Sequence, residues 1–238
     1  MDVAALVPLS LSDHDGYVAA VVFVPGCNFR CPFCHNADLV LPERAAGGPR
    51  VPVDEVLEEL RDRRDFLDSV VVSGGEPTLQ PGLQELLASV RAMGLRVKLD
   101  TNGSRPDVLR LLFEGKLVDY VAMDIKAPPA RYSEFAGVPV DLVRIEESIR
   151  LIRSMAPDYE FRTTVAPGLG AEDLRAVADW ISGAKRYFLQ PFRVPPEKGL
   201  LDPAWADREA LSPHALRDIW VSVAPLVGGG GVRAPAAI

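Results

Sequence analysis

Short apolar runs and amphipathic helical segments alternate along this chain from residue 17 to residue 190. The short runs, several of them rich in valine, are typical of strands buried on both faces. The segments between them place apolar residues at the i, i+3, i+4, i+7 spacing of a helix with one buried stripe. The pattern predicts strands at residues 17–24, 69–73, 95–99, 120–125, 161–165 and 187–190. It predicts helices at residues 53–60, 83–90, 108–113, 142–152 and 174–181.

Strands that alternate with helices form a parallel sheet, because each helix returns the chain to the same end of the sheet. We therefore expect an α/β fold built from six βα units, with a short N-terminal extension before them. Ser212-Pro213 predicts the start of one more helix at residues 214–223. We expect no functional role for three further segments. They are a turn at 13–16 with His14 as an ordinary turn residue, a flexible connector at 45–49, and a mobile tail from Gly228.

All three cysteines of the chain, Cys27, Cys31 and Cys34, lie in one loop directly after the first predicted strand. Thiolates favour zinc, copper(I) or iron–sulfur clusters, and spacings of three and then two residues let one loop wrap a compact metal centre. A structural zinc ion would need His35 as a fourth ligand, which is hard because His35 directly follows Cys34. A disulfide would leave an odd thiol and is typical of secreted chains. A four-iron cluster held by three cysteines leaves one iron open to a substrate or cofactor.

Polar and glycine-rich clusters follow the other predicted strands as well. Since the carboxyl ends of parallel strands share one rim, we expect these clusters to lie together with the cysteines. Paired glycines let backbone approach a ligand closely, and short oxygen and amide groups suit ribose hydroxyls or a small cation. Taken by itself, Asn102-Gly103 is more typical of an ordinary Asx turn. A lysine at the end of a buried strand is costly unless it is paired, and Asp124 points to the same side as Lys126. The clusters are Gly74-Gly75-Glu76, Asp100-Thr101-Asn102-Gly103, Asp124-Ile125-Lys126, Arg162-Thr163 and Gln190-Pro191-Phe192-Arg193.

The cysteine spacing, with Phe33 just before the last cysteine, resembles the signature of the radical S-adenosylmethionine (SAM) enzymes. Ser73-Gly74-Gly75-Glu76-Pro77, one helix further on, is similar to the glycine-rich methionine-binding motif of that family. Residues 25–36, PGCNFRCPFCHN, resemble more narrowly the activating enzymes of glycyl-radical proteins. They are most similar to activators of anaerobic ribonucleotide reductase, with pyruvate formate-lyase activators close behind. The resemblance extends from about residue 8 to about residue 195.

The resemblance implies a single radical SAM domain over residues 1–238, with a partial, TIM-like (βα)6 barrel at about 17–195 and a C-terminal extension at about 196–238. It implies a 4Fe-4S cluster on Cys27, Cys31 and Cys34, and a monovalent cation on Asp100, Thr101 and Asp124. Arg193 falls where pyruvate formate-lyase activators place a histidine near SAM. The residues expected to bind SAM are Phe33, beside the adenine, and His35, Gly74, Gly75, Glu76, Thr101, Asn102, Asp124, Lys126 and Arg193.

Composition narrows the class of protein further. The formal net charge of −7 and a pI near 5.1 argue against a broad nucleic-acid footprint, which needs clustered Lys and Arg. The sequence has no apolar run as long as a membrane span and no basic signal region at its start, so we expect a cytoplasmic protein in which free thiols survive. Three cysteines suffice for one cluster, which excludes radical enzymes with auxiliary clusters.

By resemblance, the protein cleaves SAM reductively and abstracts a hydrogen from a glycine of a partner glycyl-radical enzyme, with a flavodoxin or ferredoxin as electron donor. Anaerobic ribonucleotide reductase is the expected partner. A second interpretation keeps the radical enzyme and gives it a small molecule or modified base, as in the 7-carboxy-7-deazaguanine synthases. A third interpretation is a non-catalytic iron–sulfur or zinc module. It does not explain why the polar clusters lie on the shared rim.

Overall fold

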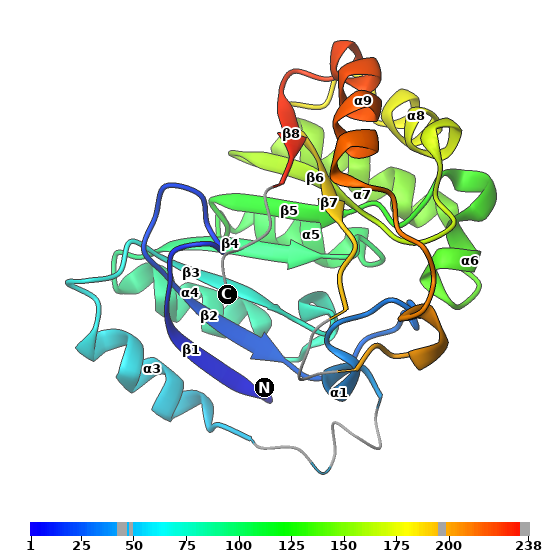
Figure 1. Cartoon of the computed structure of the whole chain (residues 1–238). Helices are drawn as coiled ribbons and strands as arrows, with labels where there is room; N and C mark the ends of the chain where they lie inside the picture. The colour runs from blue at the N-terminus through cyan, green and yellow to red at the C-terminus, as the bar shows by residue number, and fades with distance from the viewer. Residues whose placement is uncertain (42–46, 48–49, 195–198, 234–238) are drawn as a thin grey trace.

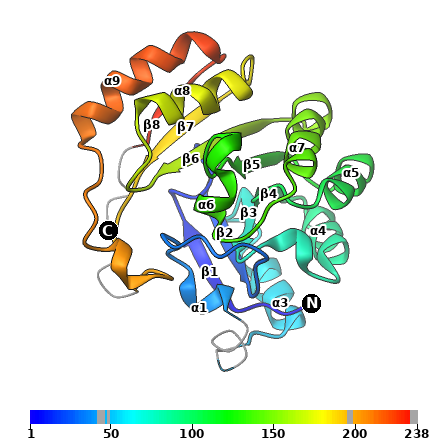
Figure 2. The same cartoon turned by 90° about the vertical axis from the view of Figure 1, so that its right-hand side faces the viewer.

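The computed structural model describes residues 1–41, 47, 50–194 and 199–233. Its strands form one eight-stranded sheet in chain order over these residues (Figures 1 and 2). The six strands from β2 to β7 are parallel, β1 adds to β2 in antiparallel fashion, and β8 adds to β7 in parallel. The strands are β1 (Ala5–Ser10), β2 (Ala19–Val24), β3 (Ser69–Gly74), β4 (Arg96–Thr101), β5 (Tyr120–Asp124), β6 (Tyr159–Val165), β7 (Tyr187–Pro191) and β8 (Gly230–Val232).

Helices cover the outer side of the curved sheet, as Figures 1 and 2 show for α3, α4, α5, α7 and α8. The α-helices are α1 (Ala37–Val40), α3 (Val53–Asp62), α4 (Leu83–Ala92), α5 (Pro106–Glu114), α6 (Tyr132–Ala136), α7 (Leu142–Met155), α8 (Ala171–Trp180) and α9 (Pro213–Val223). Short 3-10 turns lie at Pro77–Leu79, Pro129–Arg131, Pro203–Trp205 and Ala224–Leu226. None of the helices in the described ranges is long and apolar enough to cross a lipid bilayer.

The two faces of the sheet bury different surfaces. On β2, Ala20, Val22 and Val24 face outward and join the main core beneath the helices. The alternate residues Ala19 and Val21 form a small separate cluster on the inner face, together with Val71 of β3 and Phe23. A barrel wall has the same two surfaces, an outer one packed against helices and an inner one that faces the barrel interior. The predicted α/β barrel of six parallel strands is therefore confirmed.

The predicted strands and helices are all present, and the ends of the sheet differ from expectation. The predicted N-terminal extension contains edge strand β1, which pairs with β2. The predicted mobile tail at 228–231 is wrong, because Gly230 to Val232 pair with Tyr187 to Leu189 as β8. A Cβ at Gly230 would lie 1.7 Å from the Tyr187 carbonyl oxygen, so glycine permits this approach. The predicted connector at 45–49, except residue 47, and the boundary near 195 between barrel and extension lie outside the described residues.

His14 is not the ordinary turn residue that the sequence predicted. Its side chain is buried, and Nδ1 lies 3.0 Å from Oγ of Ser69 at the start of β3. Burial lowers the pKa of His14 to about 4, and the nearby charges of Lys98 and Arg96 lower it further. The imidazole is therefore neutral at physiological pH, and its contact with Ser69 links the turn before β2 to the start of β3.

Candidate active site

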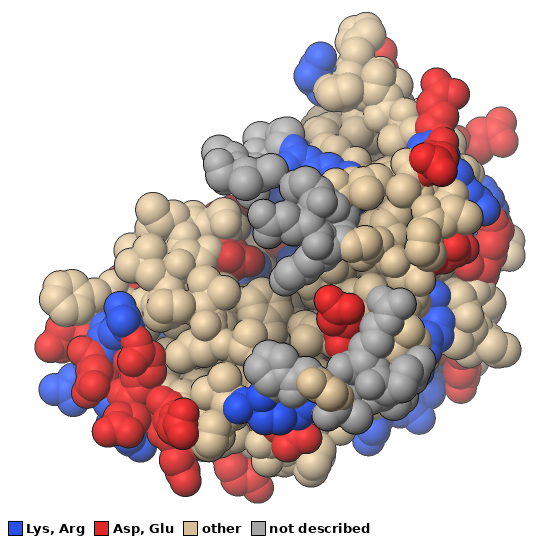
Figure 3. Space-filling view, turned by 60° about the horizontal axis from the view of Figure 1, so that its bottom comes forward, with Lys and Arg blue, Asp and Glu red and all other residues tan. Residues whose placement is uncertain are grey.

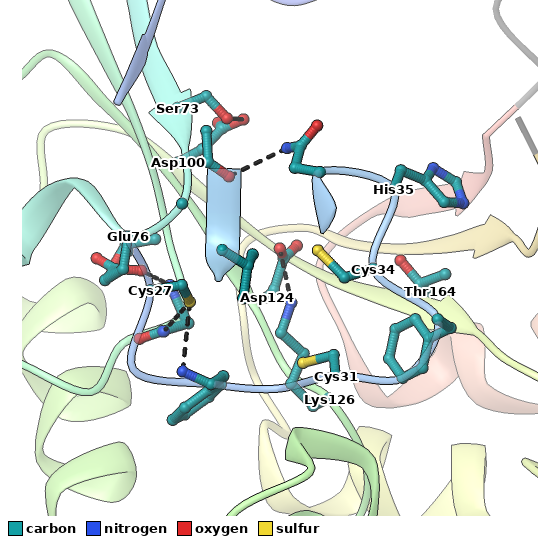
Figure 4. Close-up of a pocket in the computed structure, with 18 of the residues that line it drawn as sticks. Cys27, Cys31, Cys34, His35, Ser73, Glu76, Asp100, Asp124, Lys126 and Thr164 are labelled. Atoms are coloured by element: carbon teal, nitrogen blue, oxygen red, sulfur yellow. Dashed lines mark hydrogen bonds and ion pairs between the residues drawn. The ribbon is translucent and has the colours of Figure 1, made fainter. Parts of the chain in front are cut away.

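A cavity of about 230 Å³ lies at the carboxyl ends of the parallel strands, where the predicted polar clusters meet (Figure 4). The cysteine loop after β2 forms one wall, and residues from the ends of β3, β4, β5 and β6 form the others. The lining residues are Cys27, Phe29, Cys31, Phe33, Cys34, His35, Asn36, Val40, Ser73, Gly74, Gly75, Glu76, Asp100, Thr101, Asn102, Asp124, Lys126, Arg162 and Thr164. The structure thus brings together every residue of the expected site except Arg193.

The cysteine loop is held from outside the cavity by segments that carried no signal in the sequence. The backbone N–H of Arg30 donates to the carbonyl of Ala136 in α6 at 2.8 Å. A Cβ at Gly137 would lie 2.0 Å from the carbonyl oxygen of Arg30, so only glycine permits this contact. On the other side, the N–H of Leu201 donates to the carbonyl of Cys34 at 3.2 Å. The C-terminal extension is therefore part of the support of the loop.

The three thiols suit a cluster better than a single metal ion. Burial raises the pKa of Cys27 to about 11 and that of Cys31 to about 12, so without a cation the thiols stay protonated. Iron supplies the positive charge that favours the thiolate. The backbone N–H of Phe29 already points at Sγ of Cys27, at 3.3 Å. Among the described residues, no three Cys, His, Asp or Glu side chains are placed to share one metal ion.

Gly74 and Gly75 let the β3 loop lie against the cysteine loop. A Cβ on Gly74, whose φ is +117°, would lie 2.5 Å from the backbone nitrogen of Val24. A Cβ on Gly75 would lie 1.9 Å from the carbonyl oxygen of Gly26. The side chain of Asn36, at the end of the cysteine loop, donates to the carbonyl of Gly74 at 3.0 Å. The glycines thus fix the distance between the two motifs.

Glu76 fastens the β3 loop to the end of β4. Its carboxylate is buried and accepts from the backbone N–H of Asn102 at 2.7 Å, from Oγ1 of Thr101 at 2.8 Å, and from the N–H and hydroxyl of Thr78. Burial raises the pKa of Glu76, while these four donors oppose the shift. The Asx turn considered from the sequence also forms, since Ser104 N–H donates to Oδ1 of Asn102 at 2.9 Å.

The side-chain amide of Asn102 faces the cysteine loop. Its Nδ2 lies 3.8 Å from Sγ of Cys27 and donates to Oδ1 of Asn28 at 3.0 Å. Asn28 in turn donates to Oγ of Ser104 at 2.9 Å. Asn102 therefore both lines the cavity and positions Cys27.

Lys126 has the carboxylate partner that the sequence predicted. Its Nζ lies 3.1 Å from Oδ2 of Asp124, as the dashed line in Figure 4 shows. Burial opposes charge on both groups, yet Arg162 and Lys126 lower the pKa of Asp124 to about 2, and Asp124 raises the pKa of Lys126. The pair therefore stays ionised at the cavity wall.

The three residues expected to hold a monovalent cation also make contacts within the protein. Oδ1 of Asp124 pairs with Nε of Arg162 at 2.9 Å, and Oδ2 of Asp100 lies 3.4 Å from Nη1 of the same guanidinium. Oδ1 of Asp100 lies 3.6 Å from Nζ of Lys98. The hydroxyl of Thr101 donates to Glu76. Oδ1 of Asp100 is nevertheless buried without a hydrogen-bond partner among the described residues, so one carboxylate oxygen stays open to a ligand and the cation stays a prediction.

His35 and Arg193 meet beside the cavity. Nε2 of His35 lies 2.7 Å from the backbone carbonyl of Arg193, and Figure 4 shows the ring turned away from the sulfur atoms. Burial lowers the pKa of His35. Arg193 lines a second cavity, of about 630 Å³, which shares His35, Asp100 and Arg162 with the first. The structure therefore places Arg193 next to the expected SAM site but not in its wall.

Phe33 forms part of an aromatic cluster. Its ring centroid lies 5.8 Å from that of Trp205 in the C-terminal extension and 6.2 Å from that of Phe135 in α6. Only 5% of its surface is exposed, on the side of the cavity. Phe33 thus connects the cavity wall to both segments that hold the cysteine loop.

One group of acidic side chains on the surface lies away from this cavity. Figure 3 shows acidic side chains gathered over α3, where Asp54, Glu55, Glu58 and Asp62 are exposed. Inside the cavity, by contrast, Asp100 and Asp124 are balanced by Lys126 and Arg162. Apart from Glu76, whose carboxylate accepts four hydrogen bonds, the charged side chains of the cavity wall are therefore paired.

The sequence pattern that defines the Radical SAM superfamily matches residues 21–181. The chain belongs to this superfamily. Radical SAM enzymes use a 4Fe-4S cluster and SAM, so this protein is an enzyme of that chemistry, and the zinc alternative falls away. The residues of the cavity fit these cofactors: three thiols on one loop, a glycine-built approach of backbone, and charged groups on the opposite wall.

Three relatives are similar to this radical SAM chain. A Methanocaldococcus jannaschii protein, assigned provisionally by its name as a glycyl-radical enzyme activating enzyme, is 35% identical over 198 residues, 80% of this chain and 79% of that one. A 7-carboxy-7-deazaguanine synthase of Methanopyrus kandleri is 38% identical over 50% of this chain and 55% of its own length. A pyruvate formate-lyase-activating enzyme of Staphylococcus epidermidis is 29% identical over 68% of each chain.

Solved structures agree on the fold. Streptococcus suis SuiB bound to S-adenosylmethionine superposes with a TM-score of 0.68 over 91% of this chain, at 14% identity. The present chain spans about half the length of SuiB, 52% of the solved chain. Identity at this level supports the shared radical SAM barrel and nothing finer.

Proposed function

We propose that this protein is an activating enzyme that introduces a glycyl radical into a partner enzyme, with anaerobic ribonucleotide reductase as the partner. The observation that carries the proposal is the similarity to a relative named as an activating enzyme, which extends over four fifths of both chains. The amino-acid sequence of residues 25–36 supports the choice of reductase, because it is most similar to activators of anaerobic ribonucleotide reductase. A flavodoxin or ferredoxin is the proposed electron donor.

In this proposal the cofactors supply the radical chemistry and the chain supplies the geometry. Cys27, Cys31 and Cys34 hold the 4Fe-4S cluster. The backbone of Gly74 and Gly75 binds the amino-acid end of SAM, while Glu76 keeps that backbone in place through its bonds to Thr101 and Asn102. The remaining proposed SAM contacts are Phe33, His35, Thr101, Asn102, Asp124 and Lys126, with Arg193 in the wall of the adjoining second cavity.

Access to the cavity suits a protein substrate. In the described sheet β1 and β8 are the two edges and do not pair with each other. The second cavity is lined from both edges, by Ser12, Asp13 and Asp15 before β2 and by Val232 and Arg233 at β8. It shares three residues with the cofactor cavity. A loop of a partner entering between the edges would thus reach the reacting end of SAM.

Incubation under anaerobic reduction with SAM and purified anaerobic ribonucleotide reductase tests the partner. We expect a glycine-centred doublet in the paramagnetic resonance spectrum, absent when the target glycine of the reductase is replaced by alanine. Pyruvate formate-lyase, tested in parallel, should give no doublet. A doublet only with pyruvate formate-lyase would contradict the choice of partner.

A second candidate function rests on the similarity to 7-carboxy-7-deazaguanine synthase over half of the chain. It predicts formation of 7-carboxy-7-deazaguanine and no radical on any partner protein. Production of that compound by the purified enzyme would replace the activating function with this one.

A further inference from the structure

A groove of about 380 Å³ lies beside the cysteine loop, separate from the second cavity described above. Its other walls are the segment between β4 and α5, the loop between α6 and α7, and the start of α7. Phe29 lines both this groove and the cofactor cavity, and only 4% of its surface is exposed. The Phe29 groove and the cofactor cavity are therefore separated by a single buried residue.

The wall of the Phe29 groove is in contact with Cys27. The backbone N–H of Phe29 points at Sγ of Cys27, at 3.3 Å. Asn28 is exposed in the groove, and its Oδ1 accepts from Nδ2 of Asn102 at 3.0 Å. The same Nδ2 lies 3.8 Å from the Cys27 sulfur. An electron that crosses this wall would reach a cluster on Cys27 without entering the space proposed for SAM and the substrate.

Three arginines border the Phe29 groove. Arg105 and Arg144 line it. Arg30 lies at its edge, because its backbone packs against Gly137, the residue before Val138 of the groove. Each arginine keeps a terminal nitrogen available: among the described residues, no hydrogen bond engages Nη2 of Arg30 or Nη1 of the other two. These groups can donate to carboxylates of another protein.

The two aspartates of the groove are already engaged. Asp107 accepts from Nη2 of Arg105 at 2.8 Å and from Nη2 of Arg144 at 2.6 Å. Asp141 caps α7 by accepting from the N–H of Val143 at 3.0 Å. The whole chain has a net charge of −7, so an acidic protein is repelled by the molecule as a whole. The arginines at the groove offer such a protein a place of complementary charge.

We propose that the Phe29 groove is the docking site of an acidic one-electron carrier protein, which reduces the cluster beside Cys27. The inference rests on the cluster and electron donor of the proposed function, and it does not depend on which substrate the enzyme uses. In the transfer the carrier loses one electron and the oxidised cluster gains it. No bond is formed or broken in this step.

The test is the rate at which reduced flavodoxin, or reduced ferredoxin, reduces the reconstituted cluster, followed by stopped-flow absorbance. The double variant Arg105→Glu, Arg144→Glu should be reduced at least about tenfold more slowly than the wild type, because each reversal sets like charges against the carrier. The wild-type rate should fall as salt is added, and the rate of the variant should depend on salt much less. Photoreduced deazaflavin, a small uncharged donor, should reduce both proteins equally fast.

The double variant Arg175→Glu, Arg217→Glu is the matched control. It makes the same change in net charge on the exposed surfaces of α8 and α9, outside the groove. The carriers should reduce it at nearly the wild-type rate. If the first double variant does not fold, Arg105→Gln, Arg144→Gln carries the test, since it removes both charges and adds none. It should show a smaller loss of rate and the same weak dependence on salt.

The possible failures are distinguishable. Carrier reduction of the Arg105, Arg144 variant at the wild-type rate would overturn the docking site. Equal slowing with deazaflavin would also overturn it, because the substitutions would then act on the cluster itself. A wild type that deazaflavin reduces and neither carrier reduces would refute the proposed donors and the docking site together. Failure of the activating function would appear separately, as no glycyl radical on the reductase while carrier reduction still depends on the two arginines.

Discussion

Cys31→Ala should reduce SAM cleavage by at least about 10³-fold, to background, because the cluster cannot form on two thiolates. Cys31 is the most buried of the three cysteines, and it stands between the other two in the loop. Iron content after anaerobic reconstitution should fall from about four atoms per chain to a small fraction of that. Cleavage is measured as 5′-deoxyadenosine released under reduction.

The fold should survive this substitution. Removal of one buried sulfur costs about 1 kcal/mol, so the midpoint of urea unfolding of the metal-free protein should shift only slightly. Ser89→Ala on α4 removes one side-chain atom far from the cavity and should leave iron content and cleavage unchanged. Full cleavage by Cys31→Ala with a reconstituted cluster would show that the cluster is held by other ligands.

Gly75→Ala should weaken SAM binding at least about tenfold, because a methyl group at this position forces backbone apart. The added Cβ would lie 1.9 Å from the carbonyl oxygen of Gly26, and no side chain can move to relieve the contact. The N–H of Glu76 donates to this same oxygen at 2.8 Å, so the displacement also disturbs the Glu76 network. Overpacking of this kind costs about 1–3 kcal/mol of stability.

Gly170→Ala provides the comparison. Gly170 precedes α8 with a φ of −108°, and no atom lies within 4 Å of its added Cβ. SAM affinity, measured by calorimetry on both reconstituted variants, should be that of the wild type in Gly170→Ala and strongly reduced in Gly75→Ala. Equal affinities would show that the close approach of the two loops is not needed for SAM binding.

The structural features that depend on local sequence patterns could be predicted. Buried strands such as β2 and amphipathic helices such as α3 follow from periodicity, and parallel topology then places the cysteines, Gly74-Gly75 and Asp124 on one rim. The pairing of β1 and β8 at the edges of the sheet has no comparable periodic pattern in the sequence. The glycine-rich run at 228–231 looked like a tail because only contact with Tyr187 shows why glycine is needed there.

In the candidate site, too, local contacts could be predicted from the sequence and contacts between distant segments could not. The pairing of Lys126 with Asp124 could be predicted because both lie on one strand end, two residues apart. The bridge from Arg162 to Asp100 could not, since it joins β6 to β4 across β5 and depends on the reach of one side chain. The supports of the cysteine loop at Gly137 and Leu201 are equally distant in sequence.

The paramagnetic resonance spectrum of the reduced wild-type enzyme, recorded with and without SAM, tests the central claim most directly. In the proposed site, a 4Fe-4S cluster on three thiolates keeps one iron open and SAM binds next to that iron. We predict the signal of one reduced cluster per chain, and a clear change in that signal when SAM is added. A spectrum that saturating SAM leaves unchanged would contradict the account.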